Sequence, residues 1–441
     1  MRQSRSSLSP SWGPTAFVAA LAAVIASIGV IGGDLPWLVP VGAVVASGHL
    51  PGSVPAAVAP TDGWHDALAG AQLLLWTVYH HLGGRGLVAL QTLAAAFGFG
   101  VTALGLRRQS TAGSALLVCV VVLLGSASAV LVARLSLFSL ALFPLLVLLV
   151  QEDSRRPGRR IWLSVPLLAV WANLHGMVLA GLALLGVYLV VTRARREPLL
   201  VAGVLGASLL AVFATPELWR TPLYYRDVFE NVAAARAVGL WAPLGLGPFD
   251  VLYVAAALAL FALSRGRLLP WEWVACLALA ADSIRTARVG LFLLFVLAYP
   301  AARVLRLRTP NPVALASAGC CLAALAVGLV VLSRPTSDTA LARRAAATHM
   351  VVLADPLLGE WVALYGGRIW VGNPIDAFRA RDQRLYLDWA AGDASGRTAV
   401  DHARLVLVEP KSPAGKAAAR DPRLEKLATS ANAVLYRVRS L

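Results

Sequence analysis

Charged residues are scarce in this sequence. They make up 14% of its 441 residues, whereas an ordinary soluble domain carries about 25%. The stretches 13–33, 86–106 and 312–333 contain almost no ionisable side chain. Apolar runs of about 20 residues are long enough to cross the roughly 30 Å hydrocarbon core of a bilayer. The sequence therefore argues against a soluble globular protein and predicts an α-helical polytopic membrane protein.

Lysine is absent before Lys411, so nearly all of the net charge of +16 comes from arginine. The arginines cluster in short gaps between apolar runs, as cytoplasmic loops of membrane proteins do. No basic stripe interleaved with aromatic residues is present, so we expect no nucleic-acid partner. The few cysteines all lie inside apolar runs, which argues against a disulfide framework or a cysteine-based zinc site.

Other familiar patterns are also missing. The last hundred residues contain neither a G-x-G-x-x-G motif nor a P-loop, which argues against a nucleotide site there. No internal repeat is evident, which weakens a transporter built from inverted repeats.

About eleven apolar segments are candidate membrane spans. They are 15–33, 86–106, 112–131, 135–151, 161–174, 176–193, 198–214, 249–264, 270–285, 289–305 and 312–333. If the apolar segment 66–82 lies on the outer surface as an interfacial helix, every arginine cluster falls on the cytoplasmic side. This map places the N-terminus, with Arg2 and Arg5, in the cytoplasm and the C-terminus outside. It leaves two large outer segments, 34–85 and 215–248.

The runs 161–174 and 176–193 are short for two ordinary spans, and we expect a turn between them at Asn173-Leu174-His175-Gly176. The sequence changes character in its tail, 334–441, where charges are mixed and dense. We therefore divide the chain into a membrane domain, 1–333, and this tail. In the tail we expect strands at 350–354, 368–372, 403–408 and 433–438 and helices at 379–391 and 422–429. The alternation predicts a small extracytoplasmic α/β domain.

Acidic residues in the first outer segment are the first candidates for chemistry. Asp34 directly follows the first apolar run, where it could act as a general base on an acceptor hydroxyl or simply end a helix as a solvated acid. Asp62, His65 and Asp66 lie close together in the sequence. They could hold a sugar or a metal, or form a polar turn with Asp66 as the N-cap of the next helix.

Candidate residues for substrate binding also lie further along the chain. His175 stands between two apolar half-length runs, where a polar group is either tightly paired or in contact with a substrate. Arg220 and Arg226 in the second outer segment could bind phosphate through paired, charge-assisted hydrogen bonds, or form surface salt bridges. Arg288 could face the same phosphate group.

Several motifs together resemble bacterial GT-C-type membrane glycosyltransferases. The first outer segment contributes Asp34-Leu35-Pro36-Trp37, Gly42 and Gly48-His49-Leu50-Pro51. The most specific run is Trp171-Ala172-Asn173-Leu174-His175-Gly176. Further similar stretches are 134–138, 215–219, 240–243, 285–292 and, in the tail, 358–373. The resemblance covers nearly the whole chain.

The resemblance implies a GT-C-like fold and a reaction at the outer face of a bacterial plasma membrane. Such enzymes move a sugar from a polyprenyl-phosphate donor to a lipid, glycan or protein hydroxyl. Carried onto this chain, Asp34 is the base or a ligand of a divalent metal such as Mg or Mn. Arg220 or Arg226 holds the donor phosphate, and membrane lipids surround the spans.

The chain departs from the family pattern at Pro36 and Leu38, where relatives carry Trp and His, and at Gln72, where they often carry an acid. Three functions therefore stay open. The first is the glycosyltransferase, the second is a catalytically degenerate membrane scaffold whose tail binds a partner, and the third is a lipid or solute transporter. An intact carboxylate pair facing a cavity beneath the outer segments favours the enzyme, and a filled interior favours the scaffold.

Overall fold

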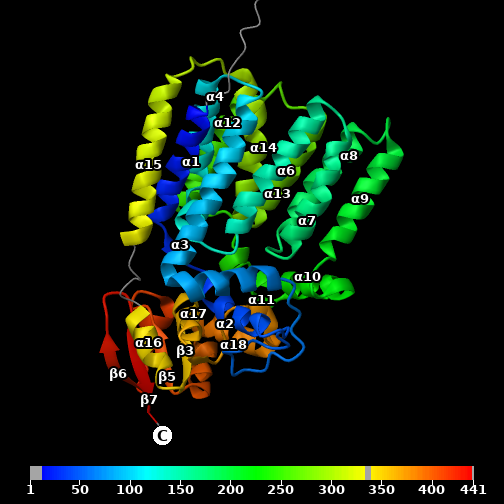
Figure 1. The fold of residues 1–441 in the computed structure, drawn as a ribbon. Helices are drawn as coiled ribbons and strands as arrows, with labels where there is room; N and C mark the ends of the chain where they lie inside the picture. Colours follow the sequence, from blue (N-terminus) through cyan, green and yellow to red (C-terminus); the bar gives the residue numbers. More distant parts are fainter. Residues whose placement is uncertain (1–11, 333–338, 440–441) are drawn as a thin grey trace, which may run out of the picture.

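The computed structural model describes residues 12–332 and 339–439. A bundle of long helices stands upright on a small C-terminal domain, and the short helices α10 (Thr221–Glu230) and α11 (Val232–Ala235) lie between the two (Figure 1). The predicted cytoplasmic residues Arg2 and Arg5, and the predicted domain boundary at 333–334, lie outside the described residues.

Apolar helices make up the bundle, because a chain in lipid must satisfy its backbone hydrogen bonds internally. Within the described ranges, four helical segments are long and apolar enough to cross a membrane, and six shorter helices are also apolar. The expected count of eleven spans therefore stays a prediction. The bundle helices are α1 (Gly13–Ser27), α3 (Ala69–Arg107), α4 (Ala112–Gly125), α5 (Ala127–Leu131), α6 (Leu137–Arg155), α7 (Ser164–Ala172), α8 (Val178–Thr192), α9 (Pro198–Val212), α12 (Pro248–Ser264), α13 (Pro270–Arg285), α14 (Gly290–Val304) and α15 (Pro312–Leu332).

Helix α3 consists of two arms that meet at Gly83. This glycine has φ +60°, which is open to glycine because it has no Cβ. The arm before Gly83 runs across the end of the bundle, and the arm after it runs along the bundle (Figure 1). The break falls at the predicted boundary between the surface segment 66–82 and the span 86–106.

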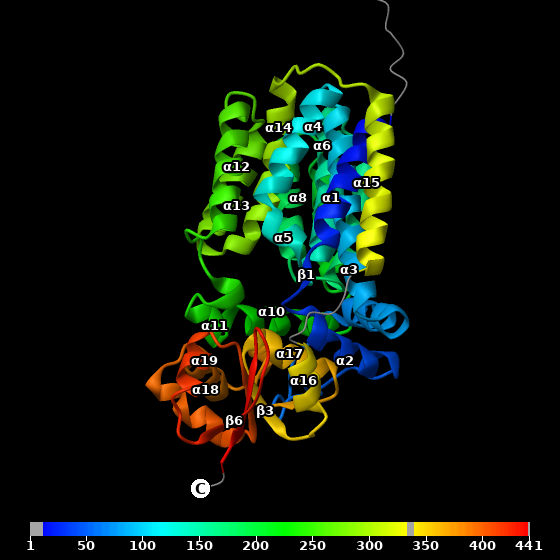
Figure 2. The same cartoon turned by 90° about the vertical axis from the view of Figure 1, so that its left-hand side faces the viewer.

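The arginine-rich turns gather at the end of the bundle that faces away from the C-terminal domain, as the loops at the top of Figures 1 and 2 show. Buried ion pairs join the helices there. Arg193 donates to Asp153 over 2.8 Å, and both side chains are at most 4% exposed. Arg303 likewise donates to the buried Glu272. These pairs hold α6, α8, α13 and α14 together without leaving a buried charge unpaired.

The C-terminal domain contains a five-stranded mixed sheet in the order β4-β3-β5-β7-β6. Strands β3 (Val351–Ala354), β4 (Arg368–Ile369) and β5 (Leu405–Val408) are parallel to one another. Strand β7 (Val434–Val438) is antiparallel to both of its neighbours, β5 and β6 (Leu424–Thr429). Helices α16 (Thr339–Ala346), α17 (Pro356–Leu364), α18 (Ala380–Ala390) and α19 (Pro413–Ala418) complete the domain. The predicted small α/β architecture is confirmed. The helix expected at 422–429 is wrong, because this segment forms β6 by pairing with β7, and such pairing overrides local propensity.

The C-terminal domain is joined closely to the first outer segment. The backbone of Val58 donates to Ile369 over 2.8 Å and that of Ala59 to Trp370 over 3.1 Å, which extends the sheet beyond β4. Arg236 also reaches Asp388 on α18 over 2.6 Å. The tail is therefore seated against both outer segments.

Candidate functional site

A short pair of parallel strands places Asp34. Strand β1 (Val30–Ile31) pairs with β2 (Val132–Ala133), so the residues that follow each strand, Asp34 and Arg134, leave the pair at the same end. Gly33 precedes the acid with φ +58°, and a Cβ there would lie 3.1 Å from the Arg134 side chain. Glycine is therefore needed both for its conformation and for this close approach. Helix α2 (Leu35–Ala46) then begins directly after Asp34.

The carboxyl group of Asp34 is electrostatically poised. Burial raises its pKa above the usual value of 3.8, while the nearby guanidinium groups of Arg134 and Arg288 favour its charged form. A carboxylate with a raised pKa accepts a proton more readily than an ordinary aspartate does. Asp34 therefore has the electrostatics expected of a general base.

A cavity of about 140 Å³ lies between the helical bundle and the C-terminal domain. We call it the interdomain pocket. Asp34, Asp66, His175 and Arg288 all line it, although they come from four separate parts of the sequence. Four of the predicted site residues thus meet in one place. The structure adds a third carboxylate, Asp376, from the C-terminal domain.

His175 is held by a hydrogen-bonded chain behind the pocket. The indole of Trp171 donates to the Ser139 hydroxyl over 2.9 Å, and this hydroxyl lies 2.6 Å from Nδ1 of His175. The Ser139 oxygen accepts the hydrogen bond from the indole, and the Ser139 hydroxyl hydrogen is then free to be donated to Nδ1 of His175. In a neutral imidazole this arrangement leaves the proton on Nε2. His175 is thus both tightly paired and present in the pocket wall.

The predicted turn between the half-length helices is confirmed between α7 and α8. The Asn173 amide donates to the backbone of Ala169 within α7 over 3.0 Å and to that of Ala214 over 2.5 Å, so it closes the end of α7. At Gly176 a Cβ would lie 2.9 Å from the hydroxyl of Tyr224. The turn is therefore fixed against α10 by a contact that only glycine permits.

Arg288 lies in the short 3-10 helix η4 (Ala287–Val289). Its guanidinium group sits over the ring of Trp241, 4.3 Å from the centroid, in a cation–π arrangement. Its Nε atom is buried and has no hydrogen-bond partner among the described residues. An anion entering the pocket would meet a cation that is oriented but not neutralised by a salt bridge within the described ranges.

Aromatic rings continue from Trp241 along one side of the pocket. Phe229 packs on Trp241 with ring centroids 5.6 Å apart, and Tyr225 stacks on Phe229 at 6.3 Å. Tyr225 also donates to the backbone oxygen of Gly176 over 3.2 Å. This row joins the second outer segment to the turn that carries His175.

Asp66 is satisfied by neighbours on its own segment. One of its oxygens accepts from the backbone of Leu68 over 3.1 Å, and the other accepts from the amide of Gln72 over 2.5 Å. Burial raises the pKa of Asp66 to about 6. The oxygen of the Gln72 amide is buried without a partner in the described residues. Asp66 therefore forms a polar turn, but the predicted N-cap role is wrong, because Leu68 is the N-cap residue of α3 and Asp66 precedes it. Gln72 provides an amide where an acid would repel Asp66.

The structure places four predicted residues away from the pocket lining. Asp62 and Arg220 are exposed. His65 bonds to Asp227 over 2.9 Å, and Arg226 donates to the other oxygen of the same carboxylate. His65 therefore joins the first outer segment to Asp227 of the second, and Arg226 pairs with the same acid, which is the salt-bridge alternative stated for Arg226 above.

The C-terminal domain supplies a wall that sequence reasoning did not assign. Asn373 and Asp376 line the pocket, and burial raises the pKa of Asp376 to about 6. Behind them, the buried Glu360 accepts a hydrogen bond from the Asn373 amide. Burial, with the charge of Asp34 nearby, raises the pKa of Glu360 well above its usual value. The tail motif between Glu360 and Asn373 was visible in the sequence, but its place beside Asp34 was not.

The described residues do not form a metal site made of protein ligands alone. Within the described ranges, no group of three or more His, Cys, Asp or Glu side chains is placed to share one. Asp66, the acid nearest to such a role, already uses both oxygens for hydrogen bonds. The Mg or Mn ion that the resemblance allows therefore stays a prediction, and we derive no step that depends on it.

Comparison with known proteins relates this arrangement to solved structures. No protein-family model and no curated protein sequence matches the chain. The crystal structure of ArnT from Cupriavidus metallidurans bound to undecaprenyl phosphate aligns with 95% of this chain and 97% of its own, with a TM-score of 0.54 and 15% identity. Its apo structure gives the same TM-score and identity.

A second protein extends the likeness. The arabinofuranosyltransferase AftD from Mycobacteria aligns with 99% of this chain and 42% of its own, with a TM-score of 0.50 and 15% identity. The resemblance inferred from the motifs is thereby confirmed at the level of the fold. The chain has an ArnT-like fold, similar to that of GT-C polyprenyl-phosphate-sugar glycosyltransferases and divergent from them in sequence.

Proposed function

We propose that this protein transfers a sugar from a polyprenyl-phosphate donor to a hydroxyl group of a lipid, glycan or protein acceptor. The observation that carries the proposal is that Asp34 and Arg288 line one pocket beside an apolar bundle. The fold supports it, since the ArnT structure with the same architecture is bound to undecaprenyl phosphate.

The reaction follows from the charges of these two residues. The carboxylate of Asp34 takes the proton of the acceptor hydroxyl as the acceptor oxygen forms its bond to the anomeric carbon of the sugar. The bond from that carbon to the phosphate oxygen breaks, and polyprenyl phosphate leaves with an additional negative charge. Arg288 stabilises this charge through charge-assisted hydrogen bonds. His175 and the aromatic row beside Trp241 form the walls that orient the sugar.

We further propose an orientation in a bacterial plasma membrane. The arginine-rich end of the bundle faces the cytoplasm, in keeping with the positive-inside rule. The interdomain pocket and the C-terminal domain then face outward, where the donor sugar is presented.

The test is sugar transfer by the purified full-length protein in lipid, with a panel of radiolabelled polyprenyl-phosphate sugars and membrane acceptors. Asp34→Asn should abolish transfer, because the amide cannot accept the acceptor proton. Asp62→Asn is the matched control, since Asp62 is exposed and outside the pocket lining, and it should transfer at the wild-type rate. Transfer that survives in Asp34→Asn would remove Asp34 from the role of base.

The scaffold remains the second candidate because of the size of the pocket. Its volume of about 140 Å³ is below the roughly 300 Å³ at which small-molecule sites usually begin. An enzyme must therefore open the pocket to admit a sugar, whereas a scaffold need not. If the protein neither transfers a sugar nor binds polyprenyl phosphate, the scaffold is favoured, and binding without transfer favours an enzyme whose acceptor is missing from the panel.

A further inference from the structure

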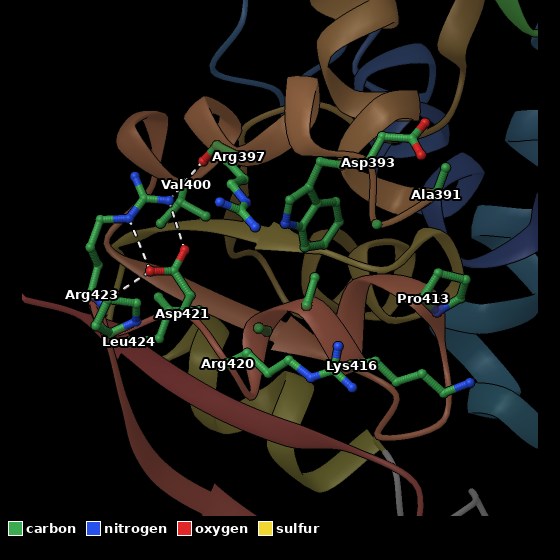
Figure 3. Close-up of a pocket in the computed structure, with 15 residues that line it drawn as sticks. Ala391, Asp393, Arg397, Val400, Pro413, Lys416, Arg420, Asp421, Arg423 and Leu424 are labelled. Carbon is green, nitrogen blue, oxygen red and sulfur yellow. Dashed lines mark hydrogen bonds and ion pairs between the residues drawn. The ribbon is translucent and has the colours of Figure 1, made fainter.

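A second cavity, of about 630 Å³, opens within the C-terminal domain. We call it the tail cavity. Its walls come from the end of α18, the 3-10 helix η6 (Ala394–His402), α19 and the turn that leads into β6 (Figure 3). None of the residues that line it also lines the interdomain pocket. It is therefore a separate feature that the proposed reaction does not use.

The charges around the tail cavity are unbalanced. Arg423 is fully engaged, because it donates to both oxygens of Asp421 and to one oxygen of Asp401. Both oxygens of Asp421 accept hydrogen bonds from Arg423, and these bonds lower the pKa of Asp421. The Arg423–Asp421 pair thus builds one rim of the cavity and adds little net charge to it.

Three other cations remain in the lining. Arg397, Lys416 and Arg420 are exposed, and within the part of the chain that the structure describes their side chains have neither a hydrogen bond nor an ion pair. Arg397 and Arg420 approach the cavity from opposite sides in the view of Figure 3. Asp393 is the one lining carboxylate outside the Arg423–Asp421 pair. The whole lining holds four cations, counting Arg423, against the two carboxylates Asp393 and Asp421, and this excess makes it an anion-attracting cavity.

The size and the walls of the tail cavity indicate more than a bare inorganic anion. Its volume lies within the roughly 300–1,000 Å³ of small-molecule sites. The planar guanidinium groups of Arg397 and Arg420 suit the oxygens of a phosphate or carboxylate group. The carboxylate of Asp393 can accept hydrogen bonds from hydroxyl groups.

We propose that the tail cavity binds an anionic saccharide, a sugar unit that carries a phosphate or a carboxylate. The acidic group lies between Arg397 and Arg420 with Lys416 at the rim, and the sugar hydroxyls face Asp393. The inference goes beyond the proposed transfer reaction, because binding in this cavity requires neither Asp34 nor a polyprenyl donor.

The test is calorimetric titration of the full-length protein in detergent with glucose 6-phosphate, glucuronate, inorganic phosphate and glucose. We expect at least one of the two anionic sugars to bind, neutral glucose not to bind, and phosphate alone to bind more weakly than that sugar. Arg420→Ala and Arg397→Ala should each weaken binding about tenfold, as expected for the loss of a charge-assisted hydrogen bond. Lys426→Ala is the matched control, because Lys426 is an exposed cation on β6 that does not line the cavity.

The outcomes separate clearly. Preference for one anionic sugar over the other identifies which acidic group the cavity takes. Absence of binding by both sugars, or binding unchanged in Arg420→Ala and Arg397→Ala, would overturn the proposal. Equal affinity for phosphate and for the better-bound sugar would overturn the saccharide part of it. Asp34→Asn should bind the anionic sugar as the wild type does, so failure here is distinguishable from failure of the proposed transferase.

Discussion

Replacing Arg288 with alanine should weaken the binding of polyprenyl phosphate about 10- to 100-fold. A hydrogen bond to a charged group contributes about 1.5–3 kcal/mol, and about 1.4 kcal/mol corresponds to a factor of ten in affinity. The structure supports the full value, because Arg288 is half-buried and its Nε has no partner among the described residues. The guanidinium group therefore gains hydrogen bonds from the phosphate without giving up an internal salt bridge.

Two further variants make the experiment specific. Arg288→Lys keeps the positive charge but loses the planar fork and most of the stacking on Trp241, so its affinity should fall between those of alanine and wild type. Arg220→Ala removes an exposed arginine from the same outer region and should bind as wild type does, because Arg220 does not line the pocket. This control also separates the arginine favoured by the structure from one favoured by the sequence.

Binding is measured by titrating a short-chain polyprenyl phosphate into the protein in nanodiscs and following tryptophan fluorescence, with native mass spectrometry as a second readout. The thermal midpoint of each variant without ligand checks that it is folded. If Arg288→Ala binds as tightly as wild type while Arg220→Ala loses binding, the phosphate site lies in the second outer segment, and the assignment of Arg288 is refuted.

Three other predictions follow from acidic residues. Because burial raises the pKa of Asp34, transfer should fall on acidification at a pH above the 3.8 of an ordinary aspartate, as a pH–rate profile would show. Asp66 has a folded pKa of about 6 against 3.8, so its stabilising contribution is complete below 3.8 and lost as the pH rises through 6. Asp66→Asn should reduce this fall of the thermal midpoint with pH, to which Asp376 also contributes, and should stabilise the protein at pH 8 by about 3 kcal/mol. An unchanged slope would contradict this prediction. Asp153→Asn should destabilise the protein by about 1.5–3 kcal/mol, because Arg193 loses its buried partner Asp153 and keeps only the pair with Glu197. Its neighbour Glu152→Gln, which loses only the partly exposed pairs with Arg108 and Arg155, should cost less than about 1 kcal/mol in the same thermal unfolding assay.

Much of the fold could be predicted from the sequence, because burial in lipid constrains composition strongly. Long apolar runs predict the bundle helices, the break in α3 falls at Gly83 with its positive φ, and polar residues and a glycine mark the turn at Asn173–Gly176. Local signals were weaker in the tail. The segment 422–429 has no decisive pattern of its own, and it is a strand because β7 offers it a hydrogen-bonding partner.

The candidate site was predicted in part. Asp34 and His175 stood out because each interrupts or follows an apolar run, and polar groups at such places are costly unless they serve a purpose. The sequence could not rank Arg220, Arg226 and Arg288, since all three are arginines near outer segments. In the structure Arg220 is exposed, and Arg226 is paired with Asp227. Only Arg288 of the three lies in the pocket wall, where the ring of Trp241 orients it.

By itself, the sequence determined the membrane character of the chain, the helical class of its larger part and the α/β class of its tail. Each of these depends on composition and periodicity, which are local properties. Only the tertiary structure decided that Asp34 meets Arg288, and that Asp376 of the tail completes the wall around them. Contacts between residues hundreds of positions apart depend on helix packing and strand register, and a short pairing such as β1 with β2 leaves almost no trace in the sequence.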